Sequence, residues 1–305
     1  MNIAITGASG FIGSNLIIFL SNITGVNVTS IVRKVDQAHK INEYTFEDLF
    51  SGAVSGNIDY FIHLASPNYD YCKDNSLQDG VVLLTENILK SLGQYKCTNF
   101  IFFSSCKVYG ESSIKNTNFI ESSDLKPVSD YAKAKAEAEM LVKKISNEME
   151  LNYLIYRLPF VYGRGMKSNI GKLLKILDKS LPVLSFKNSV GLKKSFLSME
   201  NIERAIGYNI SNNSSIDNNI YNLTDLSSIT LDNFLTHYKN LSKSKSPIIR
   251  LHKYFFFMFV KIPIIKNIFI KVFGSLVIEN SKIQKKTSIN FLPTSQCIAN
   301  LVGKI

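Results

Sequence analysis

Residues 3–13 read Ile-Ala-Ile-Thr-Gly-Ala-Ser-Gly-Phe-Ile-Gly, and this stretch decides the fold. Residues that suit a short buried strand run directly into a glycine-rich turn, and a helical pattern then continues to Leu20. In a strand-turn-helix unit the amides of the turn and the positive helix end can hold a pyrophosphate. The stretch therefore predicts a dinucleotide site at the first turn of the chain.

The three glycines of this turn have separate expected roles. Gly7 permits the tight turn, Gly10 lets phosphates approach the backbone, and Gly13 lets the helix pack against the strand. An ordinary turn between a strand and a helix is the alternative interpretation. The position after the first strand favours the dinucleotide site, whose predicted contacts are Gly7, Ser9, Gly10, Phe11, Ile12 and Gly13.

The same alternation of strand and helix continues through the first half of the chain. Strands are expected at 3–6, 26–32, 60–64, 100–104 and 153–158, and helices at 11–20, 81–92 and 131–149. This order predicts an α/β fold with a Rossmann doubly wound parallel sheet. We expect the Rossmann domain over 1–175, with a returning part at about 195–222 that includes strands near Phe196 and Tyr221. A smaller mixed substrate-binding domain is expected over 176–194 and 223–305.

The second strand ends at two cations. Arg33 and Lys34 stand where an NAD-specific protein usually presents an acidic side chain to the ribose. Both could hold a 2′-phosphate by charge-assisted hydrogen bonds, so NADP is favoured, with NAD as the alternative cofactor. A solvated basic turn would need no cofactor at all.

A Tyr-x-x-x-Lys spacing occurs twice, as Tyr69/Lys73 and as Tyr131/Lys135. Only the second pair begins a strong helical pattern, where four-residue spacing places both side chains on one face. We expect Lys135 to lower the pKa of the Tyr131 phenol and to make it a usable acid or base. A pair of surface helix residues is the alternative.

Ser104 and Ser105 end the strand over 100–104, at the edge of the sheet where ligands of such folds bind. Ser105 is the candidate that hydrogen-bonds the reacting oxygen, and its alternative role is a cap at the strand end. His63 lies within an apolar strand, so we expect it to be a packed core residue.

In this order the motifs resemble the extended short-chain dehydrogenase/reductase family, also described as the NAD-dependent epimerase/dehydratase family, which acts on nucleotide-activated sugars. The resemblance is carried by Gly7-x-x-Gly-x-x-Gly13, His63-Leu-Ala65, Ser104-Ser105, Tyr131-Ala-Lys-Ala-Lys135 and Arg157-Leu-Pro-Phe-Val-Tyr-Gly163. The segments 105–111, 157–169 and 273–283 are similar to a narrower branch. That branch holds UDP-N-acetyl-quinovosamine-type 4-ketoreductases and 4-epimerases of surface-polysaccharide pathways such as O-antigen synthesis.

The resemblance implies a set of site residues and an assembly. It makes Ser105, Tyr131 and Lys135 catalytic, and it implies a homodimer formed through the helices at 81–92 and 131–149. Further cofactor contacts would be Leu64, Ala65, Ser66, Tyr131, Lys135 and Pro159. Substrate contacts would be Ser105, Cys106, Lys107, Asn169 and Lys194, the last in place of the family's arginine.

Three activities are compared on this basis. A 4,6-dehydratase of the family carries Asp-Glu where this chain has Cys106 and Lys107, so dehydration is rejected. An NADPH-dependent reductase of a UDP-linked 4-keto-6-deoxy-N-acetylhexosamine is favoured by Arg33 and Lys34. An NAD-dependent 4-epimerase is the enzymatic alternative, and a binding protein that senses NAD(P) is the non-enzymatic one.

The net charge of +11 has a local origin. Residues 239–286 carry eleven Lys or Arg residues against Glu279 alone. Aromatic side chains and lysines alternate over 251–277, which predicts a cationic helical face packed on the substrate domain; peripheral contact with an anionic membrane is the alternative. No aromatic platform or recognised motif favours nucleic acid.

The ends and cysteines bear on location and metals. Met1 opens directly into a strand, so we expect a cytoplasmic protein, with membrane-peripheral association as a variant. Lysines and Pro263 interrupt the most apolar stretch, 255–277, which argues against a membrane span. The four scattered cysteines indicate neither a disulfide framework nor a metal site.

Overall fold

The computed structural model describes residues 1–35, 42–66, 77–166, 168–186, 191–212 and 216–303. The chain divides into two compact units. The first comprises Met1–Gly110, Asp124–Leu158 and Ala205–Tyr221, and the second comprises Glu111–Ser123, Pro159–Arg204 and Asn222–Ile305. These boundaries differ from the expected ones: 159–175 and 195–204 group with the second unit, because β8 (Phe160–Tyr162) pairs with β11 (Phe196–Ser198) in a separate small sheet.

The first unit is built on a seven-stranded sheet with the order β12-β7-β5-β4-β1-β2-β3. Every neighbouring pair from β7 to β3 is parallel, as the predicted doubly wound fold requires, so the fold class is confirmed. The strands are β1 (Asn2–Thr6), β2 (Asn27–Val32), β3 (Asn42–Thr45), β4 (Tyr60–His63), β5 (Asn99–Ser105), β7 (Asn152–Leu158) and β12 (Asn219–Asn222).

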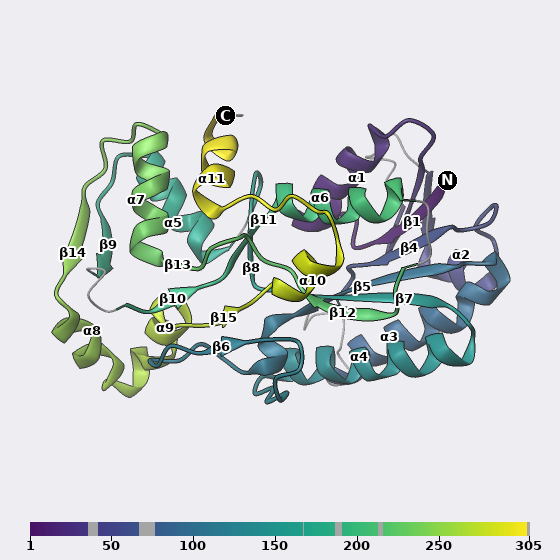
Figure 1. The fold of residues 1–305 in the computed structure, drawn as a ribbon, viewed down its shortest axis with the longest axis horizontal. Coiled ribbons are helices and arrows are strands. Elements are labelled where there is room, and N and C mark those ends of the chain that lie inside the picture. Colours follow the sequence, from purple (N-terminus) through teal and green to yellow (C-terminus); the bar gives the residue numbers. More distant parts are fainter. Residues whose placement is uncertain (36–41, 67–76, 167, 187–190, 213–215, 304–305) are drawn as a thin grey trace. The chain divides into compact units, whose positions relative to one another are not determined.

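Helices cover both faces of this sheet, as Figure 1 shows for the first unit. α1 (Phe11–Ser21) and the end of α6 (Met199–Ser211) lie on one face, where Gly207 approaches the ring of Phe19. α3 (Leu77–Ser91) and α4 (Asp130–Glu148) pack together on the other face. Short helical elements complete the unit: α2 (Phe46–Ser51), η2 (Leu92–Tyr95) and η3 (Cys106–Tyr109).

The core of the first unit explains why the central strands are apolar throughout. All four residues of β4 and all seven of β5 are buried, as expected for parallel strands covered on both faces. Phe61 and Phe100 stack at the β4–β5 register with ring centroids 5.9 Å apart. Ser104 and Ser105 close β5 and stand at its carboxyl end.

The second unit consists of short strand pairs and helices. Its strands pair as β8 with β11, β9 (Val183–Phe186) with β14 (Ile248–Leu251), β10 (Lys193–Lys194) with β13 (Ile229–Thr230), and β6 (Asn118–Phe119) with β15 (Val277–Ile278). Its helices are α5 (Asn169–Asp178), the start of α6, α7 (Leu231–Leu241), α8 (Lys253–Val260), α9 (Pro263–Phe273), α10 (Ser281–Lys286) and α11 (Thr294–Gly303).

The basic stretch 251–277 forms α8 and α9, and one side of each helix packs within the second unit as the favoured interpretation expects, with Phe269 and Phe273 of α9 against the buried residues of α8. α8 buries Phe256 and Val260, whereas α9 buries none of its residues. Pro263 occupies the first turn of α9 and divides the stretch into two helices. Within the described residues, the helices are too short or too polar to cross a bilayer.

Candidate active site

The glycine-rich turn has the backbone that the sequence predicts. Gly7 has φ of +74°, a left-handed conformation that favours glycine, and its carbonyl accepts a hydrogen bond of 2.9 Å from the Gly10 amide. A Cβ on Gly13 would lie 2.1 Å from the Gly7 carbonyl oxygen, so helix α1 and the turn meet too closely for any side chain. Gly10 caps α1 without a side-chain hydrogen bond, which leaves the first-turn amides to a ligand such as a pyrophosphate.

The Thr6 hydroxyl and the His63 ring position the backbone that follows β4, next to this turn. Thr6 Oγ1 accepts hydrogen bonds of 3.1 Å from the amides of both Leu64 and Ala65 and lies 2.8 Å from His63 Nδ1. The other ring nitrogen of His63 lies 3.2 Å from Thr85 Oγ1. Burial, with help from the charge of Lys135, holds the pKa of His63 well below its usual value, so the predicted core role of His63 is confirmed.

Ser66 follows Leu64 and Ala65 in the chain and has a buried hydroxyl. Its oxygen has no hydrogen-bond partner among the described residues, although buried hydroxyls normally have one. Leu64, Ala65 and Ser66 are half-buried and follow β4 at the same sheet edge as the glycine-rich turn. The cradle of Gly7, Gly10 and Gly13, where a Cβ would meet the backbone, together with this hydroxyl fits a dinucleotide.

One stripe of α4 faces the last three residues of β5. Tyr131, Lys135 and Glu139 are spaced by four, which places them on one side of the helix. Tyr131 hydrogen-bonds the Ser105 side chain, Lys135 Nζ donates to the Phe103 carbonyl at 3.0 Å, and Ser104 Oγ donates to Glu139 Oε1 at 2.6 Å. The structure thus brings together the three residues that the sequence predicts to be catalytic.

The electrostatics of this stripe differ from the expectation. Burial raises the pKa of Tyr131 to about 12, and the hydrogen bond with Ser105 only partly opposes that effect. The predicted lowering of the Tyr131 pKa by Lys135 is therefore wrong for the chain alone, because desolvation of the phenolate dominates. Burial also lowers the pKa of Lys135 to about 8, against the opposing charge of Glu139.

A buried ion pair stands behind the stripe, and the sequence reasoning did not find it. The guanidinium of Arg157 makes hydrogen bonds to both oxygens of Glu139, at 2.6 Å from NH2 to Oε2 and 3.0 Å from Nε to Oε1. Both side chains are almost fully buried, and Arg157 also donates to Tyr109 Oη at 2.8 Å. A charged residue inside an otherwise apolar strand was the available signal, since buried charges require partners.

The remaining predicted residues of the first unit differ in exposure. Arg33 and Lys34 are exposed just beyond the end of β2. Cys106 is buried, and Lys107 is half-buried, with its amide donating to Ser105 Oγ at 3.3 Å. The second Tyr-x-x-x-Lys pair, Tyr69 and Lys73, lies outside the described residues.

Three predicted residues lie in the second unit. Pro159 is half-buried and Asn169 is exposed at the start of α5. Lys194 is buried, and its ammonium donates to the Lys271 carbonyl of α9 at 2.6 Å and to Ser112 Oγ at 3.5 Å. The residue expected to hold a diphosphate is therefore bonded to the last turn of α9.

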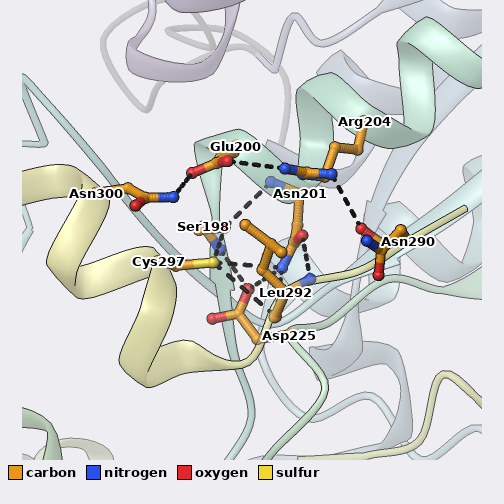
Figure 2. Close-up of polar contacts among 9 residues, drawn as sticks. All are labelled: Ser198, Glu200, Asn201, Arg204, Asp225, Asn290, Leu292, Cys297 and Asn300. Carbon is orange, nitrogen blue, oxygen red and sulfur yellow. Dashed lines mark hydrogen bonds and ion pairs between the residues drawn. The ribbon is translucent and has the colours of Figure 1, made fainter.

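A second polar cluster lies within the second unit and was not predicted (Figure 2). Asn201 donates to Asp225 at 2.7 Å and exchanges hydrogen bonds of 2.9 and 3.0 Å with the backbone of Leu292. Burial raises the pKa of the Cys297 thiol to about 12, which makes it a weak nucleophile. The cluster connects α6 to the C-terminal segment and has a structural character. Over the residues that the structure describes, no group of three His, Cys, Asp or Glu side chains could hold a metal ion.

Comparison with known proteins assigns the chain to a family. The model of the NAD dependent epimerase/dehydratase family matches residues 3–223, which is most of the chain. The chain belongs to this family. The resemblance inferred from the motifs is therefore confirmed, and the family is that of NAD dependent proteins.

Individual family members show how far the similarity extends. A UDP-glucose 4-epimerase of Vibrio cholerae is 26% identical over 215 residues, 66% of this chain and 64% of that protein. The N-acetyl-alpha-D-glucosaminyl-diphospho-ditrans,octacis-undecaprenol 4-epimerase of Escherichia coli O157:H7 is 26% identical over 262 residues, 82% of this chain and 75% of that protein. The match spans less than two thirds of the Vibrio cholerae protein's length.

Solved structures of the family share the fold. The UDP-N-acetylglucosamine 4-epimerase from Bacillus cereus superimposes with a TM-score of 0.76, at 16% identity and with 100% of this chain and 99% of that chain covered. A UDP-Glucuronic acid 4-epimerase from Bacillus cereus in complex with NAD gives a TM-score of 0.74, at 18% identity and 99% and 96% coverage. At these identities the likeness supports the fold alone.

Proposed function

We propose that this chain transfers a hydride between a nicotinamide cofactor and C4 of a sugar linked to a diphosphate. The observation that carries the proposal is the hydrogen bond between Tyr131 and Ser105 at the end of β5, with Lys135 on the same stripe of α4. Family membership and the named activities of the relatives support the same chemistry.

Each residue of the stripe has a definite role in this proposal. Tyr131 moves a proton to or from the O4 oxygen, and Ser105 orients that oxygen by a hydrogen bond. Lys135 holds positive charge near the reacting groups and stabilises the phenolate when it forms. A bound nicotinamide supplies or accepts the hydride, and the glycine-rich turn, Leu64, Ala65, Ser66 and Pro159 would hold the cofactor.

Within this chemistry we favour reduction of a UDP-linked 4-keto-6-deoxy-N-acetylhexosamine by NADPH, for surface polysaccharide synthesis. The exposed cations Arg33 and Lys34 beyond β2 support NADP, since they can hold a 2′-phosphate. Lys194, Asn169, Cys106 and Lys107 are the proposed substrate contacts.

Epimerisation at C4 with retained NAD is the second candidate, supported by relatives that are named 4-epimerases. The two reactions share the stripe and differ in how the cofactor is handled. One relative acts, by its name, on a sugar attached to undecaprenol through a diphosphate, so lipid-linked sugars belong in the test beside UDP-sugars.

A two-part measurement tests the proposal. We expect NADPH oxidation with a member of a panel of UDP- and dTDP-linked 4-keto-6-deoxy sugars, and no tightly held NAD in the purified protein. Tightly held NAD together with interconversion of 4-epimers, on UDP- or polyprenol-linked sugars, would replace the reductase by the epimerase. Nucleotide binding without turnover of any of these sugars would favour the sensing protein.

The predicted homodimer remains a proposal. Leu83 on α3 and Met140 on α4 are exposed apolar side chains, 48% and 62% accessible, on two helices that pack together. A contact between copies through these helices would cover both. Light scattering should report a dimer for the natural chain and a monomer when both residues are replaced by lysine; a dimer in that variant would place the contact elsewhere.

A further inference from the structure

An apolar patch covers the outside of α8 and α9. The apolar patch consists of Tyr254, Phe255, Phe257, Met258, Ile264 and Ile268. Ile264 is 88% exposed, Tyr254 71% and Ile268 62%, values far above those of core side chains. Single exposed apolar residues are common, but six on two consecutive helices form a surface that marks an interaction.

The same two helices are already apolar on their inner side. Phe256 and Val260 are buried against Phe186 and Leu192 of the second unit, and Phe269 and Phe273 pack against that group. The rings of Phe186 and Phe273 meet edge to face with centroids 4.9 Å apart. After Lys253, α8 is apolar around its whole circumference, and such a helix requires a second apolar environment because its inner packing satisfies only one side.

The chain segment that carries the patch has charges of a single sign. Between Asp232 and Glu279 the sequence holds eight Lys or Arg residues and no acidic residue. Lys266 and Lys271 are exposed on α9, and Lys261 is exposed at the C-cap of α8. In α9, Ile264, Ile268 and Lys271 follow one stripe of the helix, so a cation borders the exposed isoleucines.

Hydrogen bonds hold the segment that contains α8 and α9 to the rest of the second unit at both of its ends. β14 leads into α8 and pairs with β9 over four residues. At the other end, Ser275 and Ser113 exchange backbone hydrogen bonds of 2.7 and 2.9 Å. The Lys194 ammonium also binds the carbonyl of Lys271. The patch is therefore presented by a fixed helical element.

We propose that the apolar patch docks on an anionic lipid surface. Apolar side chains bordered by lysines match the boundary between acyl chains and anionic headgroups, and lysine stems can extend to the phosphates. A second copy of the chain fits less well, since patch against patch would oppose the lysines of both copies without a carboxylate between them. The inference does not depend on which sugar the enzyme uses.

Sedimentation of the full-length protein with vesicles tests the proposal. We expect binding to vesicles of phosphatidylcholine mixed with phosphatidylglycerol, much weaker binding to phosphatidylcholine alone, and partial loss at high salt. Replacing both Ile264 and Ile268 by serine should weaken binding roughly tenfold, since two inserted apolar side chains are lost. A second variant, Lys261→Gln with Lys266→Gln, should weaken binding to the anionic vesicles while leaving the weak binding to phosphatidylcholine unchanged.

Controls separate docking from folding and from self-association. Ile18→Ser changes a 65% exposed isoleucine on α1 and should bind vesicles like the natural chain. Circular dichroism should give the same melting temperature for the patch variants, because they replace exposed side chains. No binding to anionic vesicles, or binding that both patch variants retain, would overturn the proposal. A serine variant that only lowers the oligomeric state in light scattering would assign the patch to a second copy.

Discussion

Helices α4 and α9 differ in which residues they bury: α4 buries charged side chains, whereas α9 exposes apolar ones. α4 has eight charged residues among nineteen, yet nine of its residues are buried, including Lys135 and Glu139. α9 has only two lysines among eleven residues, and none of its residues is buried. The charges that α4 buries all have partners, whereas Ile264 and Ile268 of α9 are 88% and 62% exposed among the described residues. Chemistry is therefore expected where charge is buried, and docking where apolar surface is exposed.

Removing the phenol of α4 should have the largest effect. Tyr131→Phe deletes the group that is proposed to move the proton, and we expect turnover to fall by about 10²- to 10⁴-fold. Nucleotide affinity should change little, because the phenyl ring stays. Steady-state rates and equilibrium titration with NADPH and NAD measure the two quantities, with Tyr254→Phe on α8 as the control. Unchanged turnover in the Tyr131 variant would remove Tyr131 from the mechanism.

Breaking the buried ion pair behind the stripe should strongly destabilise the first unit. Glu139→Leu leaves the Arg157 guanidinium buried without its carboxylate, which we expect to cost about 3–5 kcal/mol of unfolding free energy. Urea denaturation measures this. Glu148→Leu, at the exposed end of the same helix, is the matched control and should stay within about 0.5 kcal/mol. Equal losses in the two variants would show that the pair contributes no special stability.

Removing the buried ammonium should stabilise the fold. The pKa of Lys135 is lowered from 10.5 to about 8, so the folded state releases its proton more easily than the unfolded chain does. Below pH 8 this disfavours the native state by up to about 3 kcal/mol, and the cost disappears as pH rises through 10.5.

Lys135→Met should therefore raise the unfolding free energy at pH 7, lose most activity, and show a stability advantage that shrinks between pH 8 and pH 10.5. Chemical denaturation across this pH range follows the effect. Lys133→Met, two residues away on the exposed side, is the control and should show no such pH dependence. A destabilised Lys135→Met variant at pH 7 would mean that the ammonium is a net structural contributor.

The smallest effect on stability is expected at the most exposed apolar residue. Ile264→Ser should change the unfolding free energy by less than about 0.5 kcal/mol, because the side chain contributes little to the packed core. Replacing the buried Ile170 of α5 should instead lower the unfolding free energy by about 2–5 kcal/mol. Thermal melts of both variants decide the matter; a large loss at Ile264 would show that α9 packs more tightly than its exposure indicates.

Some elements of the first unit could be predicted from the sequence, and others could not. Strands β1, β4 and β5 were found because they are continuous apolar runs, and α4 because its helical propensity is strong. β3 and α2 were missed: β3 is polar and holds only four residues, too few for a periodicity. Burial of Glu139 and Arg157 was missed as well, because pairing of residues 18 positions apart depends on tertiary packing.

Tyr131 and Lys135 of the stripe were accessible to sequence reasoning since they follow a four-residue spacing on one helix. The electrostatics of the stripe were not, because the pKa of Tyr131 depends on how far the hydroxyl is removed from water. α9 shows a similar limit: lysines and apolar residues in sequence indicate a helix, but not which of its sides the rest of the chain covers.

Pro263 limits the length of the helix that follows it. It ends the apolar stretch of α8 and restarts it as α9, whose eleven residues span roughly 16 Å, about half the thickness of a bilayer's hydrocarbon core. Under the proposed docking, these short helices would lie along the interface and insert side chains into one leaflet only, which would expand that leaflet relative to the other. Their docking would consequently sense how tightly the lipids are packed, with stronger attachment where the leaflet is curved or loosely filled.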